Sequence, residues 1–330
     1  MEIAFTGDLV LQQVKEEPEH IFKEFVNFIH SENIKLCINL ESPFIQKGMS
    51  PIKNKISLHA IPETIKYLNY LNPNLINLSN NHVNDYGNES AKLTIDLIKS
   101  NGFNYTGVGY SSKKENVVID SNIIYLTYTT RSADFTNSKL FADNDFIGPY
   151  APDFDQISKL KIKYSTHKII VNIHWGIEDI KYVEPSKRKI AKEIIDSGAD
   201  MIIGHHPHII QPIELYKNKY IFYSIGNFYF NDISYNLEKK LINKKALKHQ
   251  KKGIVPVFLI NDKIQLSKIY QVKINKLNVL ETKIIKIKTS RPNEAYYSLF
   301  YKIYSFYLLN TRRILRVLKN PSLINKLFKR

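Results

Sequence analysis

Short apolar segments that run directly into polar, metal-competent residues recur along this 330-residue chain. Six such segments are predicted β-strands, and they lead in order into the following groups: Thr6-Gly7-Asp8, Asn39-Leu40-Glu41, Asn80-Asn81-His82, His174-Trp175-Gly176, Gly204-His205-His206-Pro207-His208 and Ser224-Ile225-Gly226-Asn227. Ligands of α/β folds bind at the carboxyl ends of strands. The pattern therefore predicts that the six groups meet in one pocket.

Helix signals lie between several of these strands. Ile61 to Leu71 places apolar residues on one face, Ala91 to Asn101 is followed by Gly102, and Ser186 to Ser197 is followed by Gly198. Both glycines stand where a left-handed C-cap is expected. A succession of strand, polar motif, helix and strand predicts an α/β fold.

The segment from Gly204 to Gln211 holds three of the ten histidines of the chain. A neutral imidazole is a nitrogen donor suited to Zn, Mn or Fe, and a rigid His-Pro-His turn can aim two imidazoles at neighbouring ions. The alternative is a solvated turn with one core histidine. Because the other polar groups are expected to converge on this turn, we favour a metal site.

Taken in order, these motifs resemble those of the CapA family, which is named for capsule and poly-γ-glutamate biosynthesis and is a branch of the calcineurin-like metallophosphoesterase superfamily. The resemblance runs from about Glu2 to Phe230 and includes Asp85, Glu178 and Gln211 beside the motifs above. It implies a four-layer α/β/β/α sandwich of the metallophosphoesterase type, which we place in residues 1–290, with ligands on the loops that follow the strands.

The resemblance also implies a site for two divalent metal ions, with Mn, Zn or Fe as candidates. The implied ligands are Asp8, Glu41 as a bridging carboxylate, Asn81, His174, His206 and His208. Pro207 separates the last two as a pair, which leaves His205 outside the ligand set. Val10 stands where a histidine is common in the superfamily, two residues after Asp8, so one ion is expected to have fewer ligands.

His82 and Asp85 are the catalytic candidates. Two cations held about 3.5–4 Å apart by a bridging carboxylate lower the pKa of a bound water towards about 7. His82 would stabilise a developing oxyanion or protonate the leaving group, and Asp85 would hold its imidazole in one tautomer. The alternative role for Asp85 is the N-cap of a helix from Asn88 to Asn101.

Two further residues have open alternatives. Trp175 either walls the pocket or packs in the core, and we favour packing, because an aromatic residue after a strand is more often buried. Asn227 either supports the site by hydrogen bonding or only forms a turn after Gly226, and we favour the supporting role.

The remainder of the chain predicts two different structures. Residues 253 to 288 alternate apolar and polar side chains, as in closing strands of the second sheet. From Glu294 to about Lys319 we expect a helix, part of a basic, aromatic-rich helical tail of residues 291–330, with eight Lys or Arg and no acidic residue from Lys302 onwards. Such a helix could lie on an anionic membrane. The alternative, which we favour, is that its aromatic face packs on the preceding domain.

Composition restricts the partners. The formal net charge of +16 favours an anionic polymer or a phosphorylated substrate. Nucleic acid is not favoured, because no zinc-finger, RNP or helix-turn-helix spacing is visible. Cys37 is the single cysteine. No signal peptide and no apolar run of about 18 residues is visible, so we expect a cytoplasmic location, with possible peripheral attachment to the membrane through residues 292–330.

The sequence thus predicts a metal-dependent hydrolase or transferase that acts in the biosynthesis, trimming or export of an anionic capsular polymer, such as poly-γ-glutamate or a phosphorylated polysaccharide. Phosphoester and γ-glutamyl amide chemistry both remain open. The second hypothesis is a non-catalytic metal-binding subunit of a membrane complex that synthesises such a polymer.

Overall fold

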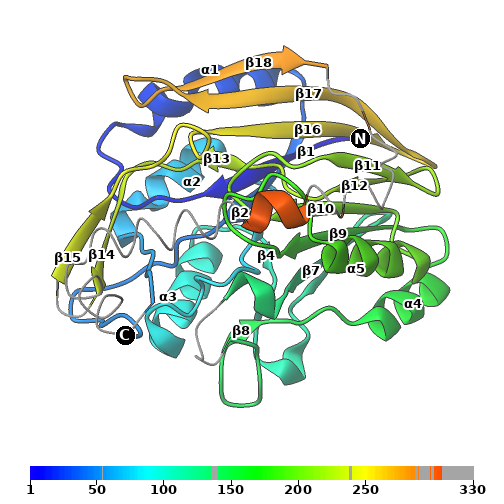
Figure 1. The fold of residues 1–330 in the computed structure, drawn as a ribbon, viewed down its shortest axis with the longest axis horizontal. Helices are drawn as coiled ribbons and strands as arrows, with labels where there is room; N and C mark the ends of the chain where they lie inside the picture. Colours follow the sequence, from blue (N-terminus) through cyan, green and yellow to red (C-terminus); the bar gives the residue numbers. More distant parts are fainter. Residues whose placement is uncertain are drawn as a thin grey trace.

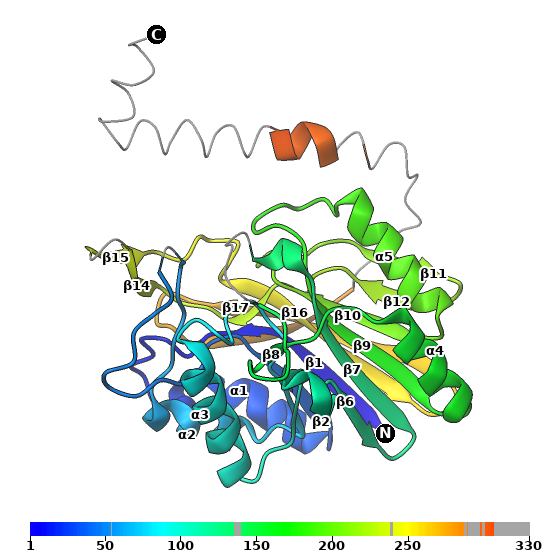
Figure 2. The ribbon, with the colours of Figure 1, turned by 90° about the horizontal axis from the view of Figure 1, so that it is seen from below.

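Two β-sheets pack against each other, and helices cover the face of each sheet that points away from the other (Figures 1 and 2). The computed structural model describes residues 1–53, 55–134, 140–237, 240–286, 289, 298 and 301–306. Over this part of the chain the α/β class predicted from the sequence is confirmed.

The first sheet contains the N-terminal strand. Its order is β18-β17-β16-β1-β2-β3-β4, with β13 also paired to β1. Its strands are β1 Glu2–Leu9, β2 Lys35–Leu40, β3 Leu75–Asn77, β4 Tyr105–Thr106, β13 Asn227–Tyr229, β16 Lys252–Ile260, β17 Ile264–Ile274 and β18 Leu280–Ile285. Strands β1 to β4 run parallel, so that their carboxyl ends lie at one edge.

The placement of the closing strands differs from the prediction. Residues 253–288 were expected in the second sheet, but β16 runs antiparallel to β1 and β17 and β18 follow outward in the first sheet. The physical reason is the free edge of β1: its pairing with β2 leaves its other side open, and β16 satisfies those backbone groups. The alternation itself predicted the strands correctly.

The second sheet has the order β11-β12-β10-β9-β7-β6. Its strands are β6 Val117–Asp120, β7 Ile123–Thr129, β9 Lys168–His174, β10 Met201–His205, β11 Ile213–Tyr216 and β12 Lys219–Phe222. The central four run parallel. Two small ribbons complete the described strands: β5 Val108–Gly109 with β8 Gly148–Pro149, and β14 Ile233–Leu237 with β15 Lys240–Lys244.

The helices confirm the three helical segments predicted from the sequence. The α-helices are α1 Pro18–Ser31, α2 Ile65–Leu71, α3 Gly87–Ser100, α4 Phe154–Lys163 and α5 Pro185–Asp196, and the 3₁₀ turns are η1 Pro62–Thr64, η2 Ser111–Lys113 and η3 Arg131–Ala133. Gly102 and Gly198 have positive φ angles of 81° and 120°, as expected for residues just past a helix end.

Alternate residues of the strands belong to different hydrophobic clusters. In β1, Ala4 packs with α1 and α2 on the outer face, while Ile3 and Phe5 pack between the sheets against residues such as Ile203 of β10. The outer face of the second sheet packs against α4 and α5. Both sheets are therefore buried on both faces, which explains why their parallel strands are nearly continuous apolar runs.

A close approach of two glycines brings β13 against β1. A Cβ atom on Gly7 would lie 2.0 Å from the carbonyl oxygen of Gly226. The absence of that atom lets Asp8 pair with Asn227 in the parallel register. This contact places a sixth motif beside the first one.

The described part of the predicted tail is short. Residues 298 and 301–306 are helical, and the rest of the helix expected from Glu294 to Lys319 lies outside the described residues. The ring of Tyr304 contacts that of Tyr182, with centroids 5.4 Å apart. Among the residues that the structure describes, no helix has the length and apolarity needed to cross a bilayer.

Candidate metal centre

The six predicted ligands come together where the parallel strands of the two sheets end. Asp8 lies in β1, His174 ends β9, and Glu41, Asn81, His206 and His208 stand in the loops just after β2, β3 and β10. All six are buried, with at most 5% of their surface exposed. The convergence predicted from the strand-end motifs is thus present in the fold.

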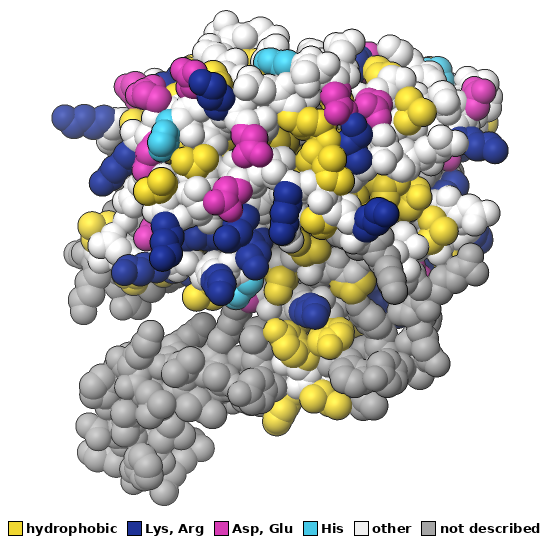
Figure 3. All heavy atoms as spheres, turned by 90° about the horizontal axis from the view of Figure 1, so that it is seen from above, with side chains coloured by type: hydrophobic (Ala, Val, Ile, Leu, Met, Phe, Trp, Pro, Cys, Tyr) yellow, Lys and Arg dark blue, Asp and Glu magenta, His cyan; other side chains and the backbone are white. Residues whose placement is uncertain are grey.

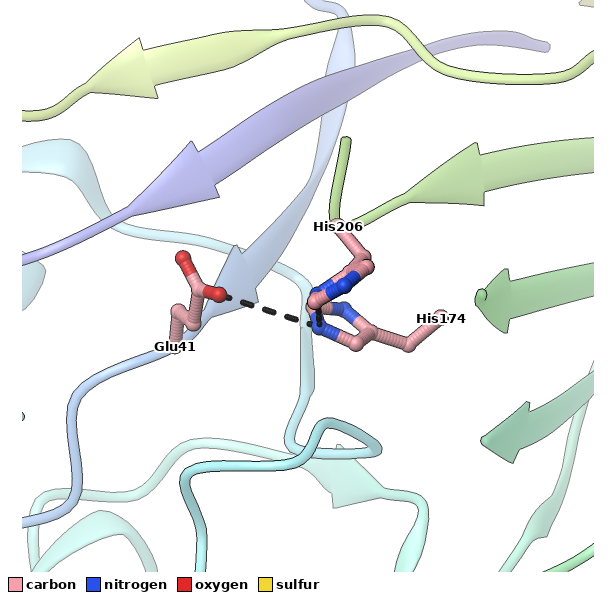
Figure 4. A group of neighbouring side chains, drawn as sticks. All are labelled: Glu41, His174 and His206. Atoms are coloured by element: carbon pink, nitrogen blue, oxygen red, sulfur yellow. Dashed lines mark hydrogen bonds and ion pairs between the residues drawn. The ribbon is translucent and has the colours of Figure 1, made fainter. Parts of the chain in front are cut away.

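The first potential metal-binding group consists of Glu41, His174 and His206 (Figure 4). His174 Nε2 lies 3.7 Å from Glu41 Oε1 and 3.1 Å from His206 Nδ1. Asn81 adds a fourth potential ligand, because its Oδ1 atom lies 2.8 Å from the same His174 nitrogen. One carboxylate, one amide and two imidazoles therefore face a common point.

The second group consists of Asp8, Glu41 and His208. His208 Nδ1 lies 3.3 Å from Asp8 Oδ2, and His208 Nε2 lies 3.7 Å from Glu41 Oε1. Glu41 is the member shared by the two groups. This is the position that a carboxylate bridging two ions would occupy.

Unsatisfied polar atoms show that this set of residues fits a cation. Both carboxylate oxygens of Glu41 and the Nε2 atom of His206 are buried and have no hydrogen-bond partner in the described part of the chain. Leaving such groups unpaired costs about 1–3 kcal/mol each, and more for a charge. A divalent ion at each group would satisfy them with ligand types that Mn, Zn or Fe accept.

The pKa values of the buried carboxylates also indicate that the site fits a cation. Burial, together with the neighbouring Asp8, Glu178 and Asp85 carboxylates, raises the pKa of Glu41 well above its ordinary value. Burial also opposes ionisation of Asp8, but His205 and His208 outweigh it and hold the pKa of Asp8 well below the ordinary value. Carboxylates crowded in this way need positive charge between them.

The histidines divide into two kinds. Burial and the neighbouring His206 hold the pKa of His174 well below its usual value, and burial lowers that of His206 to about 4. These two rings are therefore neutral, which is the form that binds a metal. Burial also disfavours the charged form of His208, but Glu41 and Asp8 outweigh it and raise its pKa to about 10. A metal would have to displace that proton.

The backbone around Pro207 aims the last two imidazoles. His206 and His208 have φ angles of 96° and 55°, a region that residues other than glycine seldom adopt. Such local strain persists where the surrounding structure imposes it, and it is frequent at functional sites. Here the turn carries both rings back towards Glu41.

Amide side chains orient Asp8, and the sequence motifs did not predict all of them. Asn39 donates to Asp8 Oδ1 at 2.6 Å, and Asn77 donates to Asn39 Oδ1 at 2.7 Å. The only signal in the sequence was the position of both asparagines at strand ends. Asn227 supports the other side, as predicted, because its Oδ1 atom lies 2.9 Å from His208 Nδ1.

Three further residues lie near the site, and His205 and Trp175 follow their expected roles. His205 is buried with its Nδ1 atom 3.4 Å from Asp8 Oδ1 and is not a member of either group. Trp175 packs in the core, stacked on Tyr223 and donating to its carbonyl oxygen. Val10, in the position where the superfamily often has histidine, packs with Leu58 and Phe230.

His82 lies beside the shared carboxylate and is held by Asp85. His82 Nδ1 is 2.6 Å from Asp85 Oδ2, and His82 Nε2 is 3.9 Å from Glu41 Oε1. The alternative role of Asp85 as a helix N-cap is wrong: Tyr86 occupies that position, and α3 has no side-chain cap. Asp85 instead turns inward, where its buried carboxylate finds donors.

Glu178 is a residue to which the sequence reading gave no role. It follows β9, and although burial would raise its pKa, His208 and His206 lower it to about 2. Its ionised carboxylate therefore faces the imidazole cluster. The signal in the sequence was its place four residues after His174, just beyond the His174-Trp175-Gly176 motif.

Residues 2–232 match the family described as bacterial capsule synthesis protein PGA_cap. The chain belongs to this family. The resemblance to the CapA family is thereby confirmed, and PGA_cap proteins are metallophosphoesterase-like.

Two Bacillus proteins are relatives of this chain. The capsule biosynthesis protein CapA of Bacillus anthracis is 30% identical over 245 residues, which cover 69% of this chain and 59% of the relative. The PGA biosynthesis protein CapA of Bacillus subtilis (strain 168) is 30% identical over 239 residues, which cover 69% of this chain and 63% of the relative. The match thus spans about three fifths of the length of these two relatives.

More distant similarities exist in sequence and in structure. A probable polyglutamine synthesis accessory protein of Mycobacterium tuberculosis is 25% identical over 205 residues, covering 58% of this chain and 54% of the relative. The sulfate thiohydrolase SoxB of Thermus thermophilus aligns with 87% of this chain and 46% of its own, at 10% identity and a TM-score of 0.38.

Proposed function

We propose that this PGA_cap protein is a metal-dependent hydrolase or transferase that acts in the biosynthesis, trimming or export of an anionic capsular polymer, such as poly-γ-glutamate or a phosphorylated polysaccharide. The observation that carries the proposal is the buried carboxylate of Glu41. It is shared by two potential metal-binding groups, and its two oxygens have no hydrogen-bond partner among the described residues.

The residues divide into two ligand sets and a proton donor. Asp8, Glu41 and His208 would hold one ion, and Glu41, Asn81, His174 and His206 the other. Bound divalent ions supply Lewis acidity and lower the pKa of water. His82, oriented by Asp85, would donate a proton or a hydrogen bond to the leaving group or the oxyanion, a contribution of typically about 10²–10⁴-fold.

Charge and relatives support an anionic substrate. The chain has a formal net charge of +16, and on the face shown in Figure 3 a group of lysine and arginine side chains lies together while others are scattered singly. The names of the Bacillus relatives refer to capsule and PGA biosynthesis. Both phosphoester and γ-glutamyl amide bonds develop negative charge in their transition states, so either substrate suits the same centre.

We also infer the remaining organisation. One hydrophobic cluster lies between the two sheets, and two others lie between each sheet and the helices on its outer face. These three clusters support a four-layer α/β/β/α arrangement within residues 1–290. Residues 291–330 would form a basic helical tail able to contact an anionic membrane, and the protein would work in the cytoplasm, at the inner face of that membrane. Liposome flotation with and without residues 292–330 tests the tail, and equal partitioning of the two forms would contradict it.

Metal analysis and hydrolysis assays test the proposed activity. The purified chain should contain divalent metal and, with added Mn²⁺, cleave at least one of a generic phosphodiester, a phosphomonoester and a γ-glutamyl amide. His206→Ala should lose both metal and activity. His82→Ala should keep the metal and lose activity, whereas His30→Ala, a change at an exposed residue of α1, should alter neither.

The alternative of a non-catalytic subunit predicts a different result. The M. tuberculosis relative carries the name of an accessory protein, which keeps this alternative in view. Bound metal without hydrolysis of any of the three substrate classes would support it over the enzyme. A metal-free protein with no activity would contradict both hypotheses.

A further inference from the structure

Lys55 is a buried lysine that belongs to none of the six motifs. It lies in the loop between β2 and η1, and only 5% of its surface is exposed. A lysine is almost never buried to this extent unless its charge is paired. Its partners therefore indicate its role.

The ammonium group of Lys55 joins three segments of the chain. Its Nζ atom lies 2.9 Å from Asp85 Oδ1 and 3.3 Å from Asp134 Oδ2, and it donates a hydrogen bond to the backbone carbonyl of Asn81. Burial alone would lower the pKa of Lys55, but Asp85 and Asp134 outweigh it and raise that pKa. Lys55 is thus a cation buried next to the candidate centre.

Asp85 divides its two oxygens between Lys55 and His82. Its Oδ1 atom faces the Lys55 ammonium at 2.9 Å, while Oδ2 faces His82 Nδ1 at 2.6 Å and accepts from the backbone N–H of Leu58, also at 2.6 Å. The order is therefore Lys55, Asp85, His82, and the far nitrogen of His82 points towards Glu41. A carboxylate fixed at both oxygens can hold an imidazole in one tautomer and one orientation.

We propose that Lys55 is a positioning residue for His82: through Asp85 it holds the imidazole with its proton on Nδ1 and directs Nε2 at the reacting group, so that Nε2 takes up the proton that His82 then donates. The catalytic part of this inference rests on the function proposed above. The structural part, the tautomer of His82, does not. Lys55 also ties the loop of residues 41–61 to the strand-end loops, so the experiment must separate positioning from simple bracing.

The first measurement reads the tautomer directly. Full-length protein with ¹⁵N-labelled histidine rings and bound Zn²⁺ is observed by long-range ¹H–¹⁵N NMR, and the His82 signals are assigned by their loss in His82→Ala. We expect wild type to show a proton on Nδ1 and none on Nε2. In Lys55→Met we expect the proton to move to Nε2 or to exchange between the two nitrogens.

A matched lysine provides the control. Lys161 forms an ion pair with Asp200 at 3.0 Å and donates to the carbonyl of His167 at 3.0 Å, on the far side of the second sheet in α4. Lys161→Met removes the same kind of side chain from the same kind of contacts and should leave the His82 spectrum unchanged. Lys55→Arg keeps the charge and should keep the Nδ1 proton.

The second measurement is kinetic, on whichever substrate the wild type cleaves fastest. Lys55→Met should lower kcat by about 10–100-fold, as for other residues that orient a functional histidine, with metal content unchanged and KM within about twofold. In the double variant with His82→Ala, removal of Lys55 should cause no further loss, because the two residues act through one group.

Several outcomes would overturn the proposal. An unchanged His82 tautomer in folded Lys55→Met would do so, as would a loss in the double variant that equals the product of the two single losses. If Lys55→Met does not fold, Lys55→Arg decides: movement of the His82 proton despite the retained charge contradicts the inference. A wild type without activity refutes the proposed function alone, since the tautomer is measured independently.

Discussion

Replacing Glu41 by glutamine should have opposite effects on the metal-free and the metal-bound protein. In the metal-free protein the change removes a buried carboxylate that accepts no hydrogen bond from the described residues, and whose ionisation burial and the carboxylates of Asp8 and Glu178 oppose more strongly than His208 favours it. With metal present the same change removes the charge shared by both ligand groups. Glutamine has nearly the same shape, so the packing of the site stays the same.

The magnitudes follow from these two roles. An unsatisfied buried polar group costs about 1–3 kcal/mol and a charged one costs more, so replacing the carboxylate by an amide that stays unpaired but carries no charge should gain about 1–3 kcal/mol. An unfolding entropy of about 2.1 cal/mol/K per residue over the 330 residues makes 1 kcal/mol equal to about 1.5 °C in Tm, so metal-free Glu41→Gln should melt about 1.5–4 °C above metal-free wild type. A metal at a concentration of about 100 Kd adds about 2.7 kcal/mol, or about 4 °C, per site in wild type and should add almost nothing in the variant.

The pH dependence gives an independent test of the sign of the stability difference between metal-free Glu41→Gln and metal-free wild type. The pKa of Glu41 is raised in the folded state, so its ionisation destabilises the metal-free fold above the unfolded-state pKa of about 4.3, and increasingly so as the pH rises. The advantage of glutamine should thus be near zero at about pH 4 and should grow as the pH rises towards the raised folded-state pKa of Glu41. At low pH both side chains are neutral.

Differential scanning calorimetry of EDTA-treated and Mn²⁺-loaded protein at several pH values measures all of these effects. The matched control is Glu63→Gln, which makes the same exchange at an exposed residue of η1 and should change Tm little in either state. Gln211→Glu is unsuitable as a control because it adds a charge. The reasoning would be refuted if metal-free Glu41→Gln melted below wild type, or if Mn²⁺ raised the Tm of both proteins equally.

Two further predictions concern metal binding and the backbone around it. The pKa of His208 is raised to about 10 without metal, so metal binding should release a proton from this ring. The Kd for Mn²⁺ or Zn²⁺, measured by calorimetry, should therefore fall at least about tenfold per pH unit between about pH 6 and 8. A Kd independent of pH would contradict this prediction. Gly7→Ala would place a Cβ atom 2.0 Å from the Gly226 carbonyl oxygen, so it should separate β13 from β1, lower the unfolding free energy of the metal-free protein by about 1–3 kcal/mol, and weaken metal binding by displacing Asp8. Denaturant unfolding in EDTA and a metal titration check the two effects, and unchanged stability would show that the strands can move apart freely.

The strand-end motifs carried most of what could be predicted. Asp8, Glu41, Asn81, His174, His206 and His208 are adjacent to apolar segments whose direction is fixed once they form parallel sheets. The local rule that a strand ends in its polar residues is therefore enough to predict their convergence. Gly102 and Gly198 marked helix ends for an equally local reason, because their positive φ suits glycine.

Contacts between distant segments could not be predicted in this way. The assignment of β16 to β18 to the first sheet depends on which edge was free, and an alternating pattern looks the same in either sheet. Likewise Lys55 and Asp85 are 30 positions apart, and nothing near Lys55 in the sequence distinguishes it from the many surface lysines.

The sequence by itself determined the class of fold, the ligand types and the edge at which they meet, because strand direction, glycine conformation and donor chemistry are properties of short segments. Only the tertiary structure decided between the two roles left open for Asp85, which contacts His82 instead of capping the helix, and only the tertiary structure placed Lys55 on Asp85. The physical reason is that burial forces every charge and polar atom to find a partner, and partners are chosen by distance in space.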